Sequence, residues 1–196
     1  MAIAEVKRRR RTTAEARAEI LDAASALLRE HPSEAVTVSA IMARTTLSRK
    51  SFYVYFPDRT ALLRELLGPL RAETDASIQC WRAASEPREA GRAALAAAAR
   101  MYQRHGAVLR TLAAASQRDA EAAGLWREFI DPLEQVAAET IARADTGLPA
   151  APTARALVTM NVHYLLDEVV DAEPEVVDAA VDILATVWAR TLYPHD

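Results

Sequence analysis

Residues 45–59 read TTLSRKSFYVYFPDR, and this short stretch decides which fold the chain adopts. The chain holds three Phe and five Tyr, and four of these rings fall within five positions: Phe52, Tyr53, Tyr55 and Phe56. Arg49 and Lys50 precede the rings directly. A solvated helix face does not carry four rings, and a buried strand does not begin with two cations. The stretch therefore predicts a surface that needs aromatic rings and positive charge side by side.

The composition of the chain predicts helices and an uneven distribution of charge. Gly is scarce, with 5 residues in 196, whereas Ala and Leu are abundant, so helix is the default expectation. Residues 1–60 carry 11 Lys and Arg against 7 Asp and Glu, while residues 61–196 carry 13 against 20. A basic front on an acidic body indicates that the front meets a polyanion and that the body has another task.

Three features of the sequence indicate the cellular compartment of the protein. Cys80 is the single cysteine, which excludes an intrachain disulfide and fits a reducing compartment. The longest uncharged run, residues 156–166, has eleven residues and is too short to cross a bilayer. The start, MAIAEVKRRRR, has cations without a following apolar segment, unlike a secretory signal. We therefore expect a cytoplasmic protein with no membrane partner.

Apolar residues at helical spacing predict an all-α chain of about nine helices. The expected ranges are 13–31, 37–44, 48–54, a fourth helix from Asp58 with a kink at Gly68-Pro69, and then 87–105, 107–115, 118–145, 152–172 and 174–193. Thr12 and Glu15 have the spacing of a capping box, which places the first helix start at Thr13. Pro132 should bend the helix that contains it, because proline removes a backbone hydrogen bond.

The first three predicted helices are short, and about four residues join the second to the third. This is the arrangement of a helix-turn-helix, whose second helix enters the DNA major groove by its N-terminal end. Phe52 and Phe56 then face a small core, while Tyr53 and Tyr55 present hydroxyls to phosphates and the two preceding cations come within reach of base edges. The alternative, an aromatic stripe that is simply core, explains the two Phe but not two Tyr beside two cations.

The stretch TTLSRKSFYVYFPDRTALLRELL, residues 45–67, resembles the N-terminal domain of the tetracycline-repressor (TetR) family of transcriptional regulators. The matching positions are Val38, Ile41, Leu47, Ser48, Ser51, Phe52, Tyr53, Tyr55, Phe56, Arg59 and Leu62. The segments LWREF (125–129) and VWARTLY (187–193), with the Met160-Asn161 pair, are most similar to the branch of that family around the ethionamide-resistance repressor (EthR). The resemblance implies three parts: a basic flexible arm over 1–12, a helix-turn-helix domain over 13–57, and a ligand-binding and dimerisation bundle over 58–196.

The resemblance also implies roles for single residues. The expected DNA-binding residues are Thr37, Arg49, Lys50, Ser51, Tyr53, Tyr55 and Arg59. The arm Lys7–Arg11 either reaches an adjacent minor groove or is a solubilising tail. Thr46 stands where the family usually has Gly in the turn, and Thr in a left-handed conformation is strained, so either the turn is built differently or it costs stability.

The acidic body is expected to bind a small molecule and a second copy of the chain. Apolar walls with one or two hydrogen-bonding groups are typical of a small-molecule pocket, although Trp and Met in helices are often plain core. The expected ligand-binding residues are Met101, Tyr102, Trp126, Phe129, Asn161, Leu165 and Trp188. Asn161 is singled out because a buried amide needs a partner. By resemblance, the eighth and ninth helices form a homodimer interface that matches a palindromic operator.

An enzyme is the rival interpretation that the sequence supports least. His163 lies one helical turn from Asp167 and Glu168, but a pair without a third ligand does not define a metal site, and no cofactor or catalytic motif is present. A helical ligand carrier without DNA binding is the other rival, and the basic front argues against it. We therefore expect a ligand-responsive DNA-binding transcriptional regulator, a repressor that a small, largely apolar effector releases from double-stranded DNA.

Overall fold

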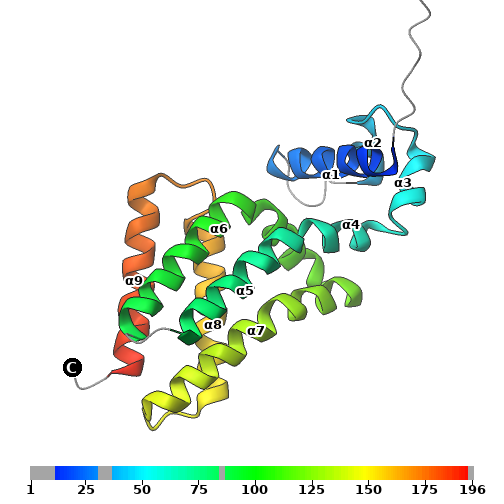
Figure 1. Ribbon diagram of the computed structural model, residues 1–196. Helices are drawn as coiled ribbons and strands as arrows, with labels where there is room; N and C mark the ends of the chain where they lie inside the picture. Colours follow the sequence, from blue (N-terminus) through cyan, green and yellow to red (C-terminus); the bar gives the residue numbers. More distant parts are fainter. Residues whose placement is uncertain (1–11, 31–36, 84–86, 194–196) are drawn as a thin grey trace, which may run out of the picture. The chain divides into compact units, whose positions relative to one another are not determined.

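The computed structural model describes residues 12–30, 37–83 and 87–193, and every regular element among them is an α-helix (Figure 1). The helices are α1 (Thr13–Glu30), α2 (Val38–Ala43), α3 (Arg49–Tyr55), α4 (Arg59–Leu66), α5 (Gly68–Ala83), α6 (Pro87–Ser116), α7 (Ala120–Ala144), α8 (Ala150–Glu168) and α9 (Pro174–Leu192). The prediction of an all-α chain is therefore confirmed. The basic arm Lys7–Arg11 lies outside the described residues.

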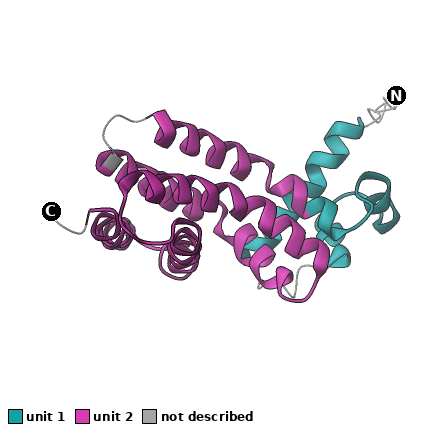
Figure 2. Cartoon of the chain, turned by 90° about the horizontal axis from the view of Figure 1, so that it is seen from below, with its two compact units in different colours: residues 1–62 teal, residues 63–196 magenta. Residues whose placement is uncertain are grey.

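The chain divides into two compact units, residues 1–62 and residues 63–196 (Figure 2). The division falls inside α4, whereas the sequence-based proposal puts the domain boundary just ahead of this helix, between residues 57 and 58.

None of the helices that the structure describes is long and apolar enough to span a bilayer.

The first unit is built around the inner face of α1. The capping box is formed: the Thr12 amide donates to Glu15 Oε2 at 2.7 Å, and the Glu15 amide donates to Thr12 Oγ1 at 3.2 Å. These bonds satisfy two amides that the first helical turn leaves without partners, so the helix begins at Thr13 as predicted. The predicted inward residues Ile20, Ala24 and Leu27 are buried. Helix α2 packs against α1, and α3 packs against α2.

In the second unit, α6 runs without a break through the expected stop at His105-Gly106, so that boundary is wrong. The physical reason is packing. A Cβ atom added at Gly106 would lie 2.2 Å from Val170 Cγ2, a distance that two carbon atoms do not reach. Gly106 therefore lets α6 approach the chain that follows α8, and the glycine serves a helix contact instead of ending a helix.

The expected kink at Gly68-Pro69 is a break between two helices. Helix α4 ends at Leu66 and α5 begins at Gly68, while the Leu67 amide still donates to the Leu63 carbonyl at 3.0 Å. Pro69 has no N–H, so the regular hydrogen-bond series is interrupted at this point. Pro132, in contrast, lies inside α7, which stays one helix from Ala120 to Ala144.

Three arginine–glutamate pairs connect the α4–α5 segment to α7. They join Arg64 to Glu121 at 3.8 Å, Arg71 to Glu128 at 2.5 Å and Arg82 to Glu139 at 3.0 Å. Each glutamate lies 57 positions after its arginine, so the two segments run parallel in a fixed register. We call these three pairs the arginine ladder.

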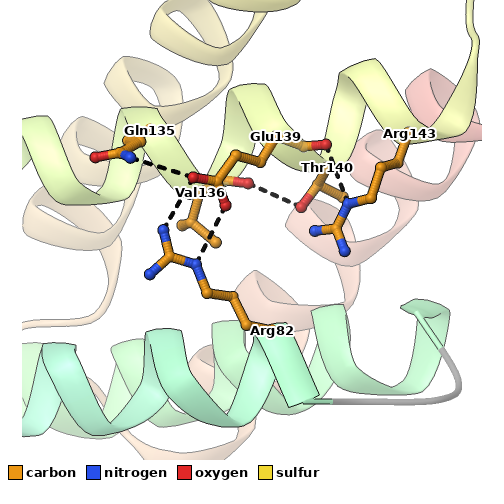
Figure 3. A network of polar contacts seen from close by, with 6 residues as sticks. All are labelled: Arg82, Gln135, Val136, Glu139, Thr140 and Arg143. Atoms are coloured by element: carbon orange, nitrogen blue, oxygen red, sulfur yellow. Dashed lines mark hydrogen bonds and ion pairs between the residues drawn. The ribbon is translucent and has the colours of Figure 1, made fainter.

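The third rung of the arginine ladder is the best supported by neighbouring groups (Figure 3). Arg82 donates to both carboxylate oxygens of Glu139, and Gln135 Nε2 donates to Oε1 of the same carboxylate at 3.2 Å. The hydrogen bond from Arg82 is the main cause that lowers the pKa of Glu139. Arg143 Nε donates to the Glu139 carbonyl oxygen, one turn back along α7.

Candidate functional site

Helix α3 is anchored by the two phenylalanines of the quoted stretch. Phe52 and Phe56 are fully buried, with ring centroids 5.6 Å apart. The Arg17 guanidinium of α1 lies 4.9 Å from the centroid of the Phe56 ring, in the geometry of a cation–π contact. Both predictions of an inward-facing ring are confirmed, and α3 is held at its centre and at its C-terminal end.

The opposite side of α3 presents charged and aromatic groups to solvent. Arg49 and Lys50 are exposed in the first turn, and Tyr53 is 57% exposed while its ring edge packs against Phe52. Tyr55 is half-buried. One short helix thus presents two cations and a tyrosine hydroxyl from a rigid core, which is the geometry that groove reading requires.

Ser51 and Val54 complete this surface. Ser51 is half-buried, and its hydroxyl lies 2.9 Å from the hydroxyl of Ser48. Val54 is 77% exposed, the largest exposure among the described large apolar side chains, and the sequence analysis missed it. Its position four residues after Lys50 was the available signal, since residues at that spacing share a helix face.

The turn between α2 and α3 is built without a left-handed residue at Thr46. The positive φ angles of non-glycine residues in the described chain belong to Asp145 and Asp171. The Thr45 hydroxyl donates to the Met42 carbonyl at 2.9 Å and accepts from the Leu47 amide at 3.2 Å. The Thr46 amide donates to Glu19 Oε1 of α1 at 2.6 Å. Side chains thus satisfy the turn, and the expected alternative of a differently built turn is the correct one.

Thr37 and Arg59 lie at helix starts on either side of this motif. Thr37 is the exposed N-cap of α2, and its Oγ1 accepts from the Ala40 amide at 3.1 Å, so its own hydroxyl proton stays available to a phosphate. Arg59 is the first residue of α4, and burial lowers the pKa of its guanidinium. Asp58 caps α4 by accepting from the Ala61 amide at 2.7 Å.

The second unit contains a cavity of about 670 Å³ whose lining comes from α5, α6, α7, α8 and α9. A volume of this order suits a drug-sized molecule. One wall consists of the alanine-rich part of α6, including Ala94, Ala97 and Ala98. No sequence pattern marks this cavity, because small side chains usually indicate tight packing. Here their small size leaves the space empty.

Five of the seven sequence-predicted ligand residues line this cavity: Met101, Tyr102, Asn161, Leu165 and Trp188. The other two, Trp126 and Phe129, lie outside the lining. Their ring centroids are 6.1 Å apart, and Phe129 is buried in the core of the unit. Burial raises the pKa of Tyr102, so its hydroxyl stays a neutral donor inside the cavity.

The Asn161 amide already has one partner inside the protein. Trp188 Nε1 lies 3.2 Å from Asn161 Oδ1, and since an indole N–H only donates, the amide oxygen accepts this bond. Trp188 therefore supplies one of the partners that a buried amide needs. The NH₂ group remains as a donor toward the cavity. The edge of Trp81 packs on Trp188 with centroids 5.7 Å apart, which fixes the indole.

Sequence analysis also missed Thr74, Trp81 and the charged residues at the cavity lining. Thr74, Ile78 and Trp81 follow helical spacing on one face of α5, a pattern that the sequence analysis did not use. Glu73 pairs with Arg104 and lies 3.5 Å from His105 Nε2. The hydrogen bond from Arg104 is the main cause that lowers the pKa of Glu73.

The outer faces of α8 and α9 differ in what they expose. Leu166 of α8 is only 6% exposed within one chain and is part of its core. Val176 and Ile183 of α9 are 45% and 50% exposed. His163 is also exposed, and its Nδ1 lies 2.9 Å from the Thr159 carbonyl oxygen. Within the described ranges, no three His, Cys, Asp or Glu side chains gather as a metal site would need.

Comparison with known proteins covers both units. Residues 20–66 match the family described as "Bacterial regulatory proteins, tetR family", and residues 91–194 match "Transcriptional regulator EthR, C-terminal domain". The "HTH-type transcriptional regulator EthR" of Mycobacterium tuberculosis (strain CDC 1551 / Oshkosh) is 30% identical over 184 residues, which cover 89% of this chain and 85% of that protein. The protein of the same description from Mycolicibacterium smegmatis is 25% identical, over 90% of this chain and 85% of its own.

A solved structure agrees with these sequence matches. The crystal structure of a TetR-like transcriptional regulator from Rhodococcus sp. RHA1 has a TM-score of 0.72 and 24% identity, over 93% of this chain and 98% of that one. The fold and the α3 surface define a helix-turn-helix regulator, and the chain belongs to the TetR family of DNA-binding transcriptional regulators. Within that family it is of the EthR branch. These relatives are regulators and not enzymes, which confirms the prediction against catalysis.

Proposed function

We propose that the protein is a cytoplasmic repressor that binds a palindromic operator as a homodimer and is released by a small, largely apolar effector. The observation that carries the DNA-binding part is the α3 surface, where buried Phe52 and Phe56 hold exposed Arg49 and Lys50 in the first turn. A rigid helix with cations at its N-terminal end suits the major groove, where arginine and lysine bind guanine O6 and N7.

The proposed contacts divide into reading and positioning groups. Arg49, Lys50 and Ser51 read base edges, and Val54 packs against a thymine methyl group because it is the most exposed apolar side chain of the helix. Phosphates are held by the remaining expected residues, Thr37, Tyr53, Tyr55 and Arg59. Phosphate contacts set the register, and base contacts select the sequence.

Helices α8 and α9 are proposed to form the dimer interface. Val176 and Ile183 lie seven positions apart on α9, which puts them on one face two turns apart, and both are about half-exposed in the single chain. An apolar face of this kind is covered when two copies pair about a two-fold axis, and the same symmetry repeats in a palindromic operator.

The cavity is proposed as the effector site. Its lining is mostly alanine and large apolar side chains, with donors from Asn161 and Tyr102, so it favours an apolar molecule with few polar groups. Helix α4 begins in the first unit and ends in the second, and the arginine ladder fixes the register of the following segment against α7. An effector that changes this register would carry its effect along α4 to α3.

DNA binding to the region upstream of the protein's own gene tests this function. Binding to a labelled fragment is measured by mobility shift over a series of salt concentrations. It should show sequence preference, and the logarithm of the association constant should fall linearly with the logarithm of the salt concentration. The absence of a complex would instead support a ligand carrier. Equal affinity for unrelated DNA would reject the operator part of the proposal.

A further inference from the structure

Thr74 differs from the other buried threonines of the described chain in its hydrogen bonding. The hydroxyls of Thr111 and Thr140 donate to the carbonyl oxygen four residues earlier, at 2.9 and 2.8 Å. This bond is the usual way in which a helix satisfies a buried threonine. Thr74 is only 8% exposed, yet its Oγ1 is buried without a hydrogen-bond partner, so the hydroxyl does not donate to the Leu70 carbonyl.

The position of this hydroxyl explains why the difference matters. Thr74 lines the cavity on α5, on the same helix face as Ile78 and Trp81, where a valine would fill the same volume at no polar cost. A buried hydroxyl without a partner destabilises the folded chain. The neighbouring Glu73 pairs with Arg104 of α6, the helix that also carries Tyr102. The unsatisfied hydroxyl therefore belongs to a residue of the cavity lining.

We propose that Thr74 is a specificity-determining residue of the effector site, and that its hydroxyl donates to a neutral acceptor oxygen, such as a ketone or amide carbonyl, on an otherwise apolar ligand. This inference rests on the proposed function of the cavity and adds the chemistry of the ligand. A rotation about the Cα–Cβ bond exchanges the hydroxyl and methyl positions, so the donor reaches a bound molecule without movement of α5. A neutral acceptor is favoured because Asn161 and the buried Tyr102 of the same lining offer neutral donors, and Arg104 of the lining is already paired with Glu73.

Two variants separate the hydroxyl from the shape of the side chain. Thr74→Val keeps the shape and removes the hydroxyl, whereas Thr74→Ser keeps the hydroxyl. Without any ligand, Thr74→Val should raise the midpoint of thermal unfolding by roughly 2–4 °C, because an unsatisfied group is removed, and Thr74→Ser should not raise it. A Thr74→Val protein that is no more stable than the wild type would show that the hydroxyl is satisfied, and the proposal would fail.

Ligand selectivity gives the second readout, with butyrophenone and butylbenzene as probes. The two molecules share a carbon skeleton and differ by one carbonyl oxygen. By isothermal titration calorimetry, the wild type and Thr74→Ser should prefer the ketone, and Thr74→Val should lose about tenfold of that preference. An unchanged preference in Thr74→Val would assign the acceptor to Asn161 or Tyr102 and overturn this inference alone. If neither probe binds the wild type, the effector part of the proposed function fails with it, while operator binding by wild type and Thr74→Val still tests the DNA-binding part separately.

Discussion

The α3 surface and the cavity of the second unit are both built on α-helices, but the first depends on large exposed side chains and the second on small ones. At α3, large side chains are present where function needs them, and the buried Phe52 holds them in place. At the cavity, small side chains such as those of Ala97 and Ala98 stand where larger ones would fill the space between the helices, and about 670 Å³ stays open. A binding surface made of exposed side chains can be recognised as a sequence motif. A cavity left by small side chains has no such motif, because its opposite walls come from distant parts of the chain.

The largest effect is expected from the ring that anchors α3. Phe52→Ala should lower the free energy of unfolding by about 3–5 kcal/mol, because it leaves a void at the centre of the small core. Val54→Ala is the matched control: this side chain is 77% exposed, so its loss should cost less than about 0.5 kcal/mol. Denaturant titration followed by circular dichroism compares the two. Equal losses would mean that α3 is not held from its inner face.

The second effect concerns the outer face of α9. Ile183→Glu should give a folded monomer, because pairing would bury an unpaired charge at a cost of roughly 3 kcal/mol, and DNA affinity should fall with dimerisation. Leu166→Glu is the contrasting variant, since Leu166 is core within one chain and its replacement should unfold the protomer. Light scattering and circular dichroism separate the outcomes. A dimeric Ile183→Glu protein would place the interface elsewhere.

The third effect lies on the reading face of α3. Lys50→Ala should weaken operator binding by about 1–3 kcal/mol and relax sequence preference at one base pair, because lysine contacts guanine in the major groove. Tyr53→Phe removes only a hydroxyl, so a smaller loss that is uniform over all DNA sequences is expected. Titration of operator and mutated operators distinguishes the two patterns. Unchanged affinity in both variants would remove α3 from the interface.

The smallest effect is expected at the arginine ladder. Glu128→Gln breaks the middle rung with Arg71, and since both side chains are partly exposed the loss should stay below about 1 kcal/mol. The difference between variant and wild type should shrink as salt is raised, because ions screen surface pairs. Thermal unfolding at two salt concentrations checks this. A large loss of stability that does not depend on salt would contradict this expectation. It would mean that the buried Arg71 Nε, which has no hydrogen-bond partner, determines the effect.

The sequence predicted the first unit in more detail than the second, for reasons that particular residues make clear. The Thr12–Glu15 capping box and the inward Phe52 and Phe56 follow from local spacing, so they could be read directly. The conformation at Thr46 could not be predicted from local spacing, because the carboxylate that accepts from its amide belongs to Glu19 on another helix. Local rules locate groups whose partners are close in sequence.

In the second unit the misses have the same cause. Gly106 was read as a break because its packing partner, Val170, lies 64 positions away. The partner of the Asn161 oxygen could not be identified from the sequence, because the indole that donates to it belongs to Trp188 of the next helix. The sequence analysis took the expected ligand residues from the aromatic, apolar and amide side chains of the second unit and from the EthR resemblance. Trp126 lies outside the cavity lining, and a tryptophan in a helix does not reveal from sequence which neighbour it faces.

The central claim is that occupancy of the cavity controls DNA reading by α3. The direct test is operator affinity in the presence and absence of compounds chosen only because calorimetry shows that they bind the cavity. Ala98→Trp, which fills part of the cavity, is the control that should abolish binding of the compounds and any response to them. We predict that saturating compounds lower the operator affinity of the wild type by at least about tenfold, since a ligand shifts an equilibrium by its differential affinity for the two states. Compounds that all bind tightly and all leave operator affinity unchanged would contradict the account.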